Sequence, residues 1–259
     1  MLPGERHRKI KDILMEYNHI DVITLSSLLG VSQVTIRKDL EKMEAEGILT
    51  RIHGGAILNS SPSVHQEVSE DPYYEEKDKI GKIASHLVGE NEVVFIGNGS
   101  TGLQVARHLK DSPRITIVTN NLSVVSALYG DCTASIFCVG GIPARIGNHL
   151  YFSGPLTISA ISQLRFNKAF LTPSAVDLSF GYSVASPDIL DLYNAVAQAS
   201  EQVIITADFT KFDRISMLKF LPLDGVSTVI SNENISNEYK QFFFDSHIPL
   251  YTTFDSSVL

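Results

Sequence analysis

The sequence has few cysteines, no long apolar run and no excess of positive charge, and each absence excludes a class of protein. Its two cysteines, Cys132 and Cys138, have no histidine or further cysteine at the spacing of a metal site, so we expect neither bound metal nor a disulfide framework. No apolar run approaches the roughly 20 residues of a membrane helix, and no apolar stretch follows the basic start as in a signal peptide. We therefore expect a cytoplasmic protein without a membrane partner.

Acidic residues outnumber basic ones, 29 to 21, and the formal net charge of -8 argues against a protein that coats nucleic acid non-specifically. The charge is unevenly distributed. Residues 1–58 hold eight basic and eight acidic side chains, so the excess of acid lies in residues 59–259. The first part of the chain is therefore neutral but patterned, and the remainder is acidic.

Length and composition indicate two domains. The chain has 259 residues, of which 44% are hydrophobic, and this is enough for about two domains with cores. The stretch 59–72 is rich in Ser, Pro and Glu and nearly free of large apolar residues, so it predicts a linker. We expect one domain over 1–58 and a second over 73–259.

The first domain has the pattern of a winged helix-turn-helix. Apolar residues at helical spacing predict a helix over 4–18, a short helix after Thr24, and a third helix that Ser32 caps and that ends at Gly47. Two short apolar stretches, 48–52 and 56–58, flank a Gly-Gly pair and predict a small hairpin. Helix, tight turn, helix and hairpin follow one another as in winged DNA-binding domains.

The third helix of this domain carries side chains that suit DNA. Gln33 can pair with adenine and Arg37 with guanine, whereas Thr35 and Lys38 can reach base edges or phosphates. A basic cluster at Arg6, Arg8 and Lys9 adds positive charge, and we assign Asp39 to an ion pair within its helix, with Arg37 or Lys42. Each residue alone is more simply a solvated charge, but the set favours DNA. The predicted DNA-binding residues are Arg8, Ser32, Gln33, Thr35, Arg37, Lys38, Arg51 and His53.

The second domain alternates between helices and strands that are apolar along their whole length. Strands are predicted at 93–96, 115–119, 135–139, 168–172, 203–207, 227–231 and 249–254, and helices at 74–88, 103–109, 122–129, 188–199 and 236–244. Buried strands separated by helices predict a mostly parallel sheet that is covered on both faces. The expected fold class is therefore α/β.

The loop GNGSTG (97–102) joins the first of these strands to a helix. Its glycines match a dinucleotide fingerprint, but the acidic residue expected about 20 positions later is missing, because the sequence there reads TNNLS. A helix N-terminus with free N–H groups and hydroxyls can bind a phosphate or another anion, although a merely structural turn is the alternative. Polar residues after other strands should converge on the same edge. The predicted effector-binding residues are Asn98, Gly99, Ser100, Thr101, Gly102, Thr119, Asn120, Asp177, Asp208 and Lys211.

Segment 31–57, VSQVTIRKDLEKMEAEGILTRIHGGAI, resembles the signature of the DeoR family of bacterial transcriptional regulators. The second domain is similar to the sensor domain of that family in its loop at 99–101, in Thr119-Asn120, in Gly140-Gly141 and in DFTKF at 208–212. It departs at Gly102, where the family has Thr, and at Tyr193-Asn194, where a basic pair is common. The resemblance implies a Rossmann-like sensor domain that is related to sugar-phosphate isomerases.

Three hypotheses of function follow. The first is a repressor of a carbohydrate-metabolism operon that binds double-stranded operator DNA, responds to a phosphorylated sugar or a related metabolite, and assembles as a dimer or tetramer. The second is a sugar-phosphate isomerase-like enzyme with an appended DNA-binding domain, in which Asp177, Asp208 and Lys211 serve as acid, base and anion holder. The third, a constitutive architectural DNA-binding protein, leaves the large α/β domain unexplained. We favour the first, without catalysis and without a cofactor.

Overall fold

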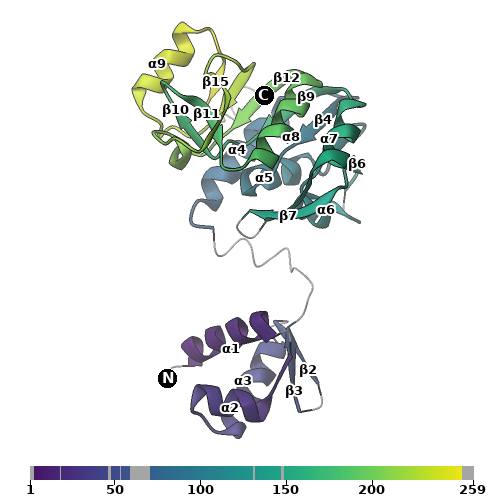
Figure 1. Ribbon diagram of the computed structural model, residues 1–259, viewed down its shortest axis with the longest axis vertical. Helices are drawn as coiled ribbons and strands as arrows, with labels where there is room; N and C mark the ends of the chain where they lie inside the picture. Colours follow the sequence, from purple (N-terminus) through teal and green to yellow (C-terminus); the bar gives the residue numbers. More distant parts are fainter. Residues whose placement is uncertain are drawn as a thin grey trace. The chain divides into compact units, whose positions relative to one another are not determined.

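The computed structural model describes residues 3–17, 19–45, 48–52, 54–58, 71–130, 132–146 and 149–252. The chain forms two compact units, Met1–Glu67 and Val68–Leu259 (Figure 1). His53 and positions 59–70 of the predicted linker lie outside the described residues. None of the described helices is both long enough and apolar enough to cross a membrane.

The first unit consists of three helices and a small antiparallel sheet with the strand order β1-β3-β2. Its core contains Ile10, Leu25, Ile36 and Leu40, which are fully or almost fully buried. This arrangement confirms the winged helix-turn-helix. The elements are α1 (Pro3–Tyr17), β1 (His19–Asp21), α2 (Val22–Leu29), α3 (Gln33–Ala45), β2 (Leu49–Ile52) and β3 (Gly55–Leu58).

Capping residues set the bounds of α2 and the start of α3. The Asp21 carboxylate accepts a hydrogen bond from the Thr24 amide at 2.9 Å, so α2 begins before Thr24 and not after it as the sequence pattern predicts. Gly30 ends α2 in the left-handed conformation, with a φ of 65°. The Ser32 hydroxyl accepts from the Thr35 amide at 3.2 Å, which confirms Ser32 as the cap of α3.

The second unit is built around a parallel sheet in the order β15-β14-β12-β9-β4-β5-β6. The first strand lies inside the sheet, and the chain adds strands on one side and then on the other, as in a Rossmann fold. The reversal falls between β4 and β9, where such folds bind ligands. The strands are β4 (Val93–Ile96), β5 (Thr116–Thr119), β6 (Ser135–Cys138), β9 (Phe166–Leu171), β12 (Ser200–Thr206), β14 (Thr228–Ile230) and β15 (Leu250–Tyr251).

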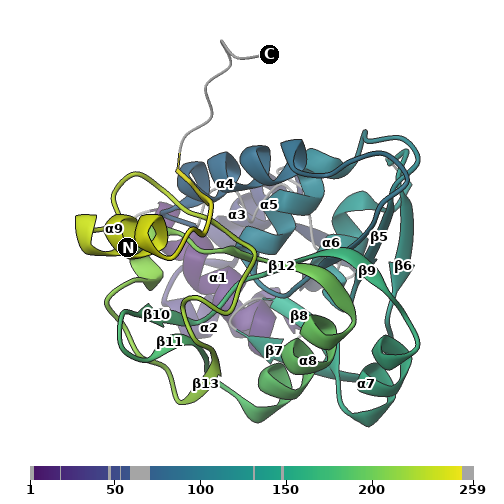
Figure 2. The ribbon, with the colours of Figure 1, turned by 90° about the horizontal axis from the view of Figure 1, so that it is seen from above.

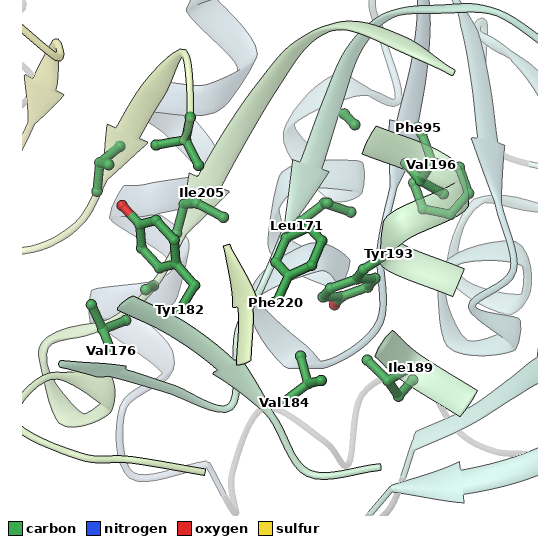
Figure 3. Close-up of a cluster of buried hydrophobic side chains, with 14 of the residues drawn as sticks. Phe95, Leu171, Val176, Tyr182, Val184, Ile189, Tyr193, Val196, Ile205 and Phe220 are labelled. Carbon is green, nitrogen blue, oxygen red and sulfur yellow. The ribbon is translucent and has the colours of Figure 1, made fainter. Parts of the chain in front are cut away.

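Helices cover both faces of this sheet (Figure 2). Within β4, Val94 and Ile96 face the core formed with α4, α5 and α6, whereas Phe95 faces the core formed with α7 and α8. Figure 3 shows this second core around Tyr193 and Phe220, whose rings meet edge to face at 5.4 Å. The helices are α4 (Tyr74–His86), α5 (Ser100–Leu109), α6 (Leu122–Leu128), α7 (Pro155–Ser162), α8 (Pro187–Gln198) and α9 (Asn237–Asp245).

Two antiparallel additions that the sequence pattern does not predict join this α/β body. One is the hairpin of β7 (Ile142–Ile146) and β8 (His149–Ser153). The other is a small sheet of β10 (Ala175–Asp177), β11 (Gly181–Val184) and β13 (Leu218–Leu221). Tyr239 of α9 ties the small sheet to that helix, because its hydroxyl donates to the Val176 carbonyl at 3.2 Å.

Candidate DNA-binding and effector-binding sites

Helix α3 has one buried and one exposed face. Ile36, Leu40 and Met43 are buried in the core of the first unit. The first turns expose Gln33, Val34, Arg37 and Lys38, with Thr35 half-buried and the capping Ser32 exposed beside them. Val34 was not among the predicted DNA-binding residues. It is 61% exposed and adds an apolar group to a mainly polar surface. This surface can offer both hydrogen bonds and methyl contacts to base edges.

The partners of Asp39, on the same helix, differ from those predicted from the sequence. It pairs with α1 rather than with Arg37 or Lys42: its carboxylate accepts from Arg6 Nη2 at 2.9 Å and lies 3.1 Å from His7 Nε2. Burial alone would raise the pKa of Asp39, but the hydrogen bonds and charges of Arg6 and His7 hold it below its usual value. Arg6 is therefore buried in an ion pair, and only Arg8 and Lys9 of the predicted basic cluster are exposed.

Arg51 lies on β2 and is exposed, but acidic residues of α3 hold its guanidinium. Its Nη1 donates to Glu41 and its Nε to Glu44, each at 2.8 Å. The backbone N–H and the guanidinium of Arg51 lower the pKa of Glu44. The sequence did not predict the ion pairs of Arg51 with Glu41 and Glu44. A phosphate contact by Arg51 would have to compete with these two carboxylates. His53 lies outside the described residues.

The glycine loop between β4 and α5 lets the helix approach the strand closely. A Cβ atom at Gly102 would lie 2.6 Å from the Gly97 carbonyl oxygen, so a side chain there would force the loop apart. Helix α5 begins at Ser100, three residues before the predicted start, and includes Thr101 and Gly102 in its first turn. The Asn98 side chain is 5% exposed, and neither its Oδ1 nor its Nδ2 has a partner among the described residues. A buried amide of this kind is suited to a polar ligand.

The structure brings the end of β5 against this loop. The Thr119 hydroxyl donates to the Ile96 carbonyl at 2.8 Å, and Asn121 Nδ2 lies 3.4 Å from the Gly99 carbonyl oxygen. Asn120 is buried and donates to the Phe152 carbonyl at 2.7 Å, while its Oδ1 has no partner in the described part of the chain. The ends of β4 and β5 thus lie against each other, and Thr119 and Asn120 are fully buried there.

Asp208 and Lys211 lie at the end of β12, two strands away from β4. Asp208 is fully buried and its Oδ1 accepts from the Thr210 amide at 3.0 Å, which caps the 3-10 turn Phe209–Lys211. Its Oδ2 is buried and has no partner among the residues described. A buried carboxylate oxygen of this kind calls for a hydrogen-bond donor, such as a water molecule or a ligand group.

Asp177 does not end a strand of the main sheet, contrary to expectation. The chain continues beyond β9 and forms β10 in the small antiparallel sheet, and Asp177 ends that strand. Its Oδ1 accepts from the Ser179 hydroxyl at 2.7 Å and from the amides of Ser179 and Phe180, which lower its pKa and close the turn to β11. This bonding gives Asp177 a structural role and leaves the predicted acid-base pair incomplete.

Two further residues, Tyr193 and Lys77, were not among the site residues predicted from the sequence. Tyr193 of α8 lies beneath the glycine loop, where its hydroxyl donates to the Thr172 carbonyl at 2.9 Å and burial raises its pKa. Lys77 of α4 is buried and donates to both carboxylate oxygens of Asp71, at 2.9 and 2.6 Å. A signal for Lys77 exists in the sequence, because it precedes Ile80 and Ala84 on the apolar stripe of its helix.

A winged helix-turn-helix joined to a Rossmann-like unit with a polar strand edge defines a class of DNA-binding regulators with a ligand-sensing part. Residues 6–62 match the family model of the DeoR-like helix-turn-helix domain, and residues 73–233 match that of the DeoR C-terminal sensor domain. The chain therefore belongs to the DeoR family. It is a transcriptional regulator that binds DNA, and it is not an enzyme.

Curated relatives share this organisation over nearly their whole length. The HTH-type transcriptional regulator GolR of Listeria innocua is 27% identical over 252 residues, which cover 96% of this chain and 98% of the relative. The transcriptional repressor AccR of Agrobacterium fabrum is 28% identical over 236 residues, 88% of this chain and 89% of that protein. Among solved structures, ribose 5-phosphate isomerase A from Neisseria gonorrhoeae matches with a TM-score of 0.39 and 20% identity, over 56% of this chain and 55% of that chain.

Proposed function

We propose that this regulator represses a carbohydrate-metabolism operon and that a phosphorylated sugar, or a related metabolite, controls its affinity for the operator. The observation that carries the proposal is the buried Asn98 amide, which has no partner among the described residues and directly precedes the glycine-lined start of α5. Free N–H groups at a helix N-terminus attract anions, and the adjacent amide adds a donor and an acceptor for a sugar hydroxyl.

The proposed effector site comprises the strand ends around this loop. Residues 98–102 bind the phosphate, Thr119 and Asn120 line the neighbouring strand end, and Asp208 and Lys211 face the rest of the ligand. Asp177 belongs to this set only if the small sheet contributes to the ligand, because local donors already occupy its Oδ1.

On the DNA side, α3 enters the major groove. Gln33, Thr35, Arg37 and Lys38 contact base edges or phosphates from its first turns, and Ser32 presents the helix N-terminus to a phosphate. Arg8, Arg51 and His53 contact the DNA backbone around the groove. One helix of this size contacts a single half-site, so the protein binds as a dimer or tetramer to repeated half-sites.

Effector and DNA act on one equilibrium between two states of the protein. The effector changes operator affinity only if it binds one state better than the other. A thermal-shift screen of phosphorylated sugars on the full chain, followed by operator binding with and without each hit, tests this function.

The matched variants for the screen are Asn98→Ala, which removes the unpartnered amide, and Gln202→Ala, which removes an exposed amide at the start of β12, on the opposite edge of the sheet. We expect the first to abolish the thermal shift and the second to preserve it. A complete screen in which no sugar phosphate stabilises the wild-type protein would contradict the effector part of the proposal.

A further inference from the structure

A carboxylate of the chain itself lies at the proposed anion site. Asp71 precedes α4, and its two oxygens accept from the Lys77 ammonium at 2.9 and 2.6 Å, while the Tyr73 amide donates to its Oδ1 at 3.0 Å. Lys77 is only 8% exposed, so its charge depends on a partner. We call Asp71, Tyr73 and Lys77 the Asp71 clamp.

The clamp reaches the first residue of α5. Burial would raise the pKa of Asp71, but the Lys77 ammonium, the Tyr73 amide and the Ser100 hydroxyl together hold it below its usual value. Ser100 is both the first residue of α5 and a member of the glycine loop. The chain therefore already supplies one negative group to the positive end of this helix.

The ends of β12 and β14 also hold the Asp71 clamp in place. The ring of Tyr73 meets that of Phe209 edge to face at 5.6 Å. Asn232, after β14, donates to the Glu76 carbonyl at 3.1 Å and accepts from the Phe209 amide at 3.1 Å. The start of α4 is thus fixed to the ends of β12 and β14 as well as to the loop after β4.

Asp71 is also the first described residue of the second unit, and the last described residue of the first unit is Leu58. Asp71 therefore lies at the start of the described part of the second unit, which follows the connection to the first unit in sequence. The clamp is therefore placed where a change at the effector site can reach that connection.

We propose that Asp71 competes with the effector for the anion site, so that a bound phosphate takes over Lys77 and the Ser100 hydroxyl and releases Asp71. The proposal rests on the proposed function of this edge as an anion-binding site. The physical reason is that two negative groups at one buried ammonium repel each other, whereas either one alone satisfies it. The clamp is then the two-state element that the effector biases.

Phosphate affinity provides the first test. Inorganic phosphate is titrated calorimetrically into the full chain as wild type, as Asp71→Asn and as Glu75→Gln. The control removes the same charge from an exposed residue in the first turn of α4. Without its internal competitor, the Asp71→Asn protein should bind phosphate at least about fivefold more tightly than wild type, and Glu75→Gln should match wild type. Equal affinities in all three proteins would overturn the proposal.

Hydrogen exchange, followed by mass spectrometry, provides the second test. The amides of Tyr73 and Tyr74 donate to Asp71, at 3.0 and 3.1 Å, so release of Asp71 should speed their exchange, while phosphate should slow exchange at residues 99–102. Slower exchange in the loop without faster exchange at Tyr73 and Tyr74 would overturn the clamp and leave the anion site intact. No change in either segment, together with no measurable phosphate binding in any of the proteins, would overturn both.

Discussion

Asp39 shows how one buried residue connects two helices of the DNA-binding unit. Its carboxylate lies on α3, yet both of its partners, Arg6 and His7, belong to α1. The pair fixes the angle between these helices through charge-assisted hydrogen bonds rather than through apolar contact alone. The exposed face of α3 is thereby oriented by a residue that is itself buried.

Removing this carboxylate should destabilise the first unit. Asp39→Ala leaves Arg6 buried without its counter-ion, so we expect the free energy of unfolding of this unit to fall by about 3 kcal/mol. Hydrogen exchange in peptides of α1 and α3, measured in the full chain, reports that loss. The control is Glu41→Gln on the same helix, whose exposed side chain pairs with Arg51 at the surface and should matter little. Equal protection in the two variants would contradict a structural role for Asp39.

The same residue predicts a dependence on pH. Its pKa lies below the ordinary value of 3.8 in the folded protein, so its contribution is present in full above that value and is lost as the pH falls through the lowered folded pKa. We expect the stability difference between wild type and Asp39→Asn to shrink as the pH falls below about 4. A difference that already shrinks between pH 7 and pH 5 would point to another group.

Arg37 and Arg51 should differ in their effects on DNA binding. Arg37 is exposed in the first turns of α3, so Arg37→Ala should weaken binding to the operator by about 1–3 kcal/mol and leave binding to random duplex nearly unchanged. Arg51→Ala should weaken binding to all sequences and flatten the salt dependence, if Arg51 leaves Glu41 and Glu44 for a phosphate.

Fluorescence anisotropy with operator and random duplexes at several salt concentrations separates these two effects. Lys42→Ala is the control, because it removes a charge from the last turn of the same helix and should not change the discrimination between the sequences. If both arginine variants bound both duplexes like wild type, the reading surface would be misplaced.

At the scale of elements, the close contact between β4 and α5 depends on Gly102. A methyl group there would meet the Gly97 carbonyl oxygen at 2.6 Å, so Gly102→Ala must displace the helix or the loop. We expect overpacking to cost about 1–3 kcal/mol, offset in part by about 1 kcal/mol from the better helix propensity of alanine. Phosphate binding should weaken as well, because the loop moves.

Thermal unfolding and phosphate titration check this expectation against Gly89→Ala. The methyl group of that variant would make ordinary contacts, the nearest at 3.5 Å from the Glu92 side chain. A Gly102→Ala protein as stable as the Gly89→Ala protein and with unchanged phosphate affinity would show that the close approach is not required.

The elements that the sequence predicts well are those with local signals. The N-cap at Ser32 and the fully apolar strand β4 each have a pattern within a few residues, and the structure contains both. The small sheet was missed because β10 has only three residues and because β11 pairs with β13, whose residues lie up to 39 positions away, as Tyr182 and Leu221 do. The hairpin of β7 and β8 was missed because the sequences of its strands, IPARI and HLYFS, do not alternate regularly between apolar and polar residues.

The same distinction applies to the candidate sites. The glycine loop and the exposed face of α3 are contiguous in sequence, so residue types and spacing are enough to locate them. The ion pair of Asp39 joins residues 33 positions apart, and the placement of Tyr193 beneath the loop requires the packing of α8 against the sheet. Asp177 was misplaced because the sequence does not show that β9 ends before it and that a separate sheet follows.

On the scale of the whole molecule, the net charge is not distributed as binding to DNA and to an anion would require. Neither unit carries an excess of positive charge. Residues 1–58 are neutral, so attraction to DNA must come from a local arrangement of positive side chains. The acidic remainder of the chain repels both DNA and anionic metabolites at long range. The anion binding that we propose there would therefore depend on short-range features, namely the start of α5 and the buried Lys77.

Coupling between the two units should obey a closed thermodynamic cycle. If a sugar phosphate found in the screen changes operator affinity by some factor, operator DNA must change the affinity for that sugar phosphate by the same factor, whatever the sign of the response. Calorimetric titration of the ligand into free and operator-bound protein, and anisotropy of the operator with and without saturating ligand, measure the two ratios. We expect both ratios to lie between about 5 and 150 and to agree. With Asp71→Asn, both should move toward one, because the clamp that links ligand to connection is already released. Ratios that agree in wild type but stay unchanged in Asp71→Asn would mean that the units communicate by a route other than Asp71.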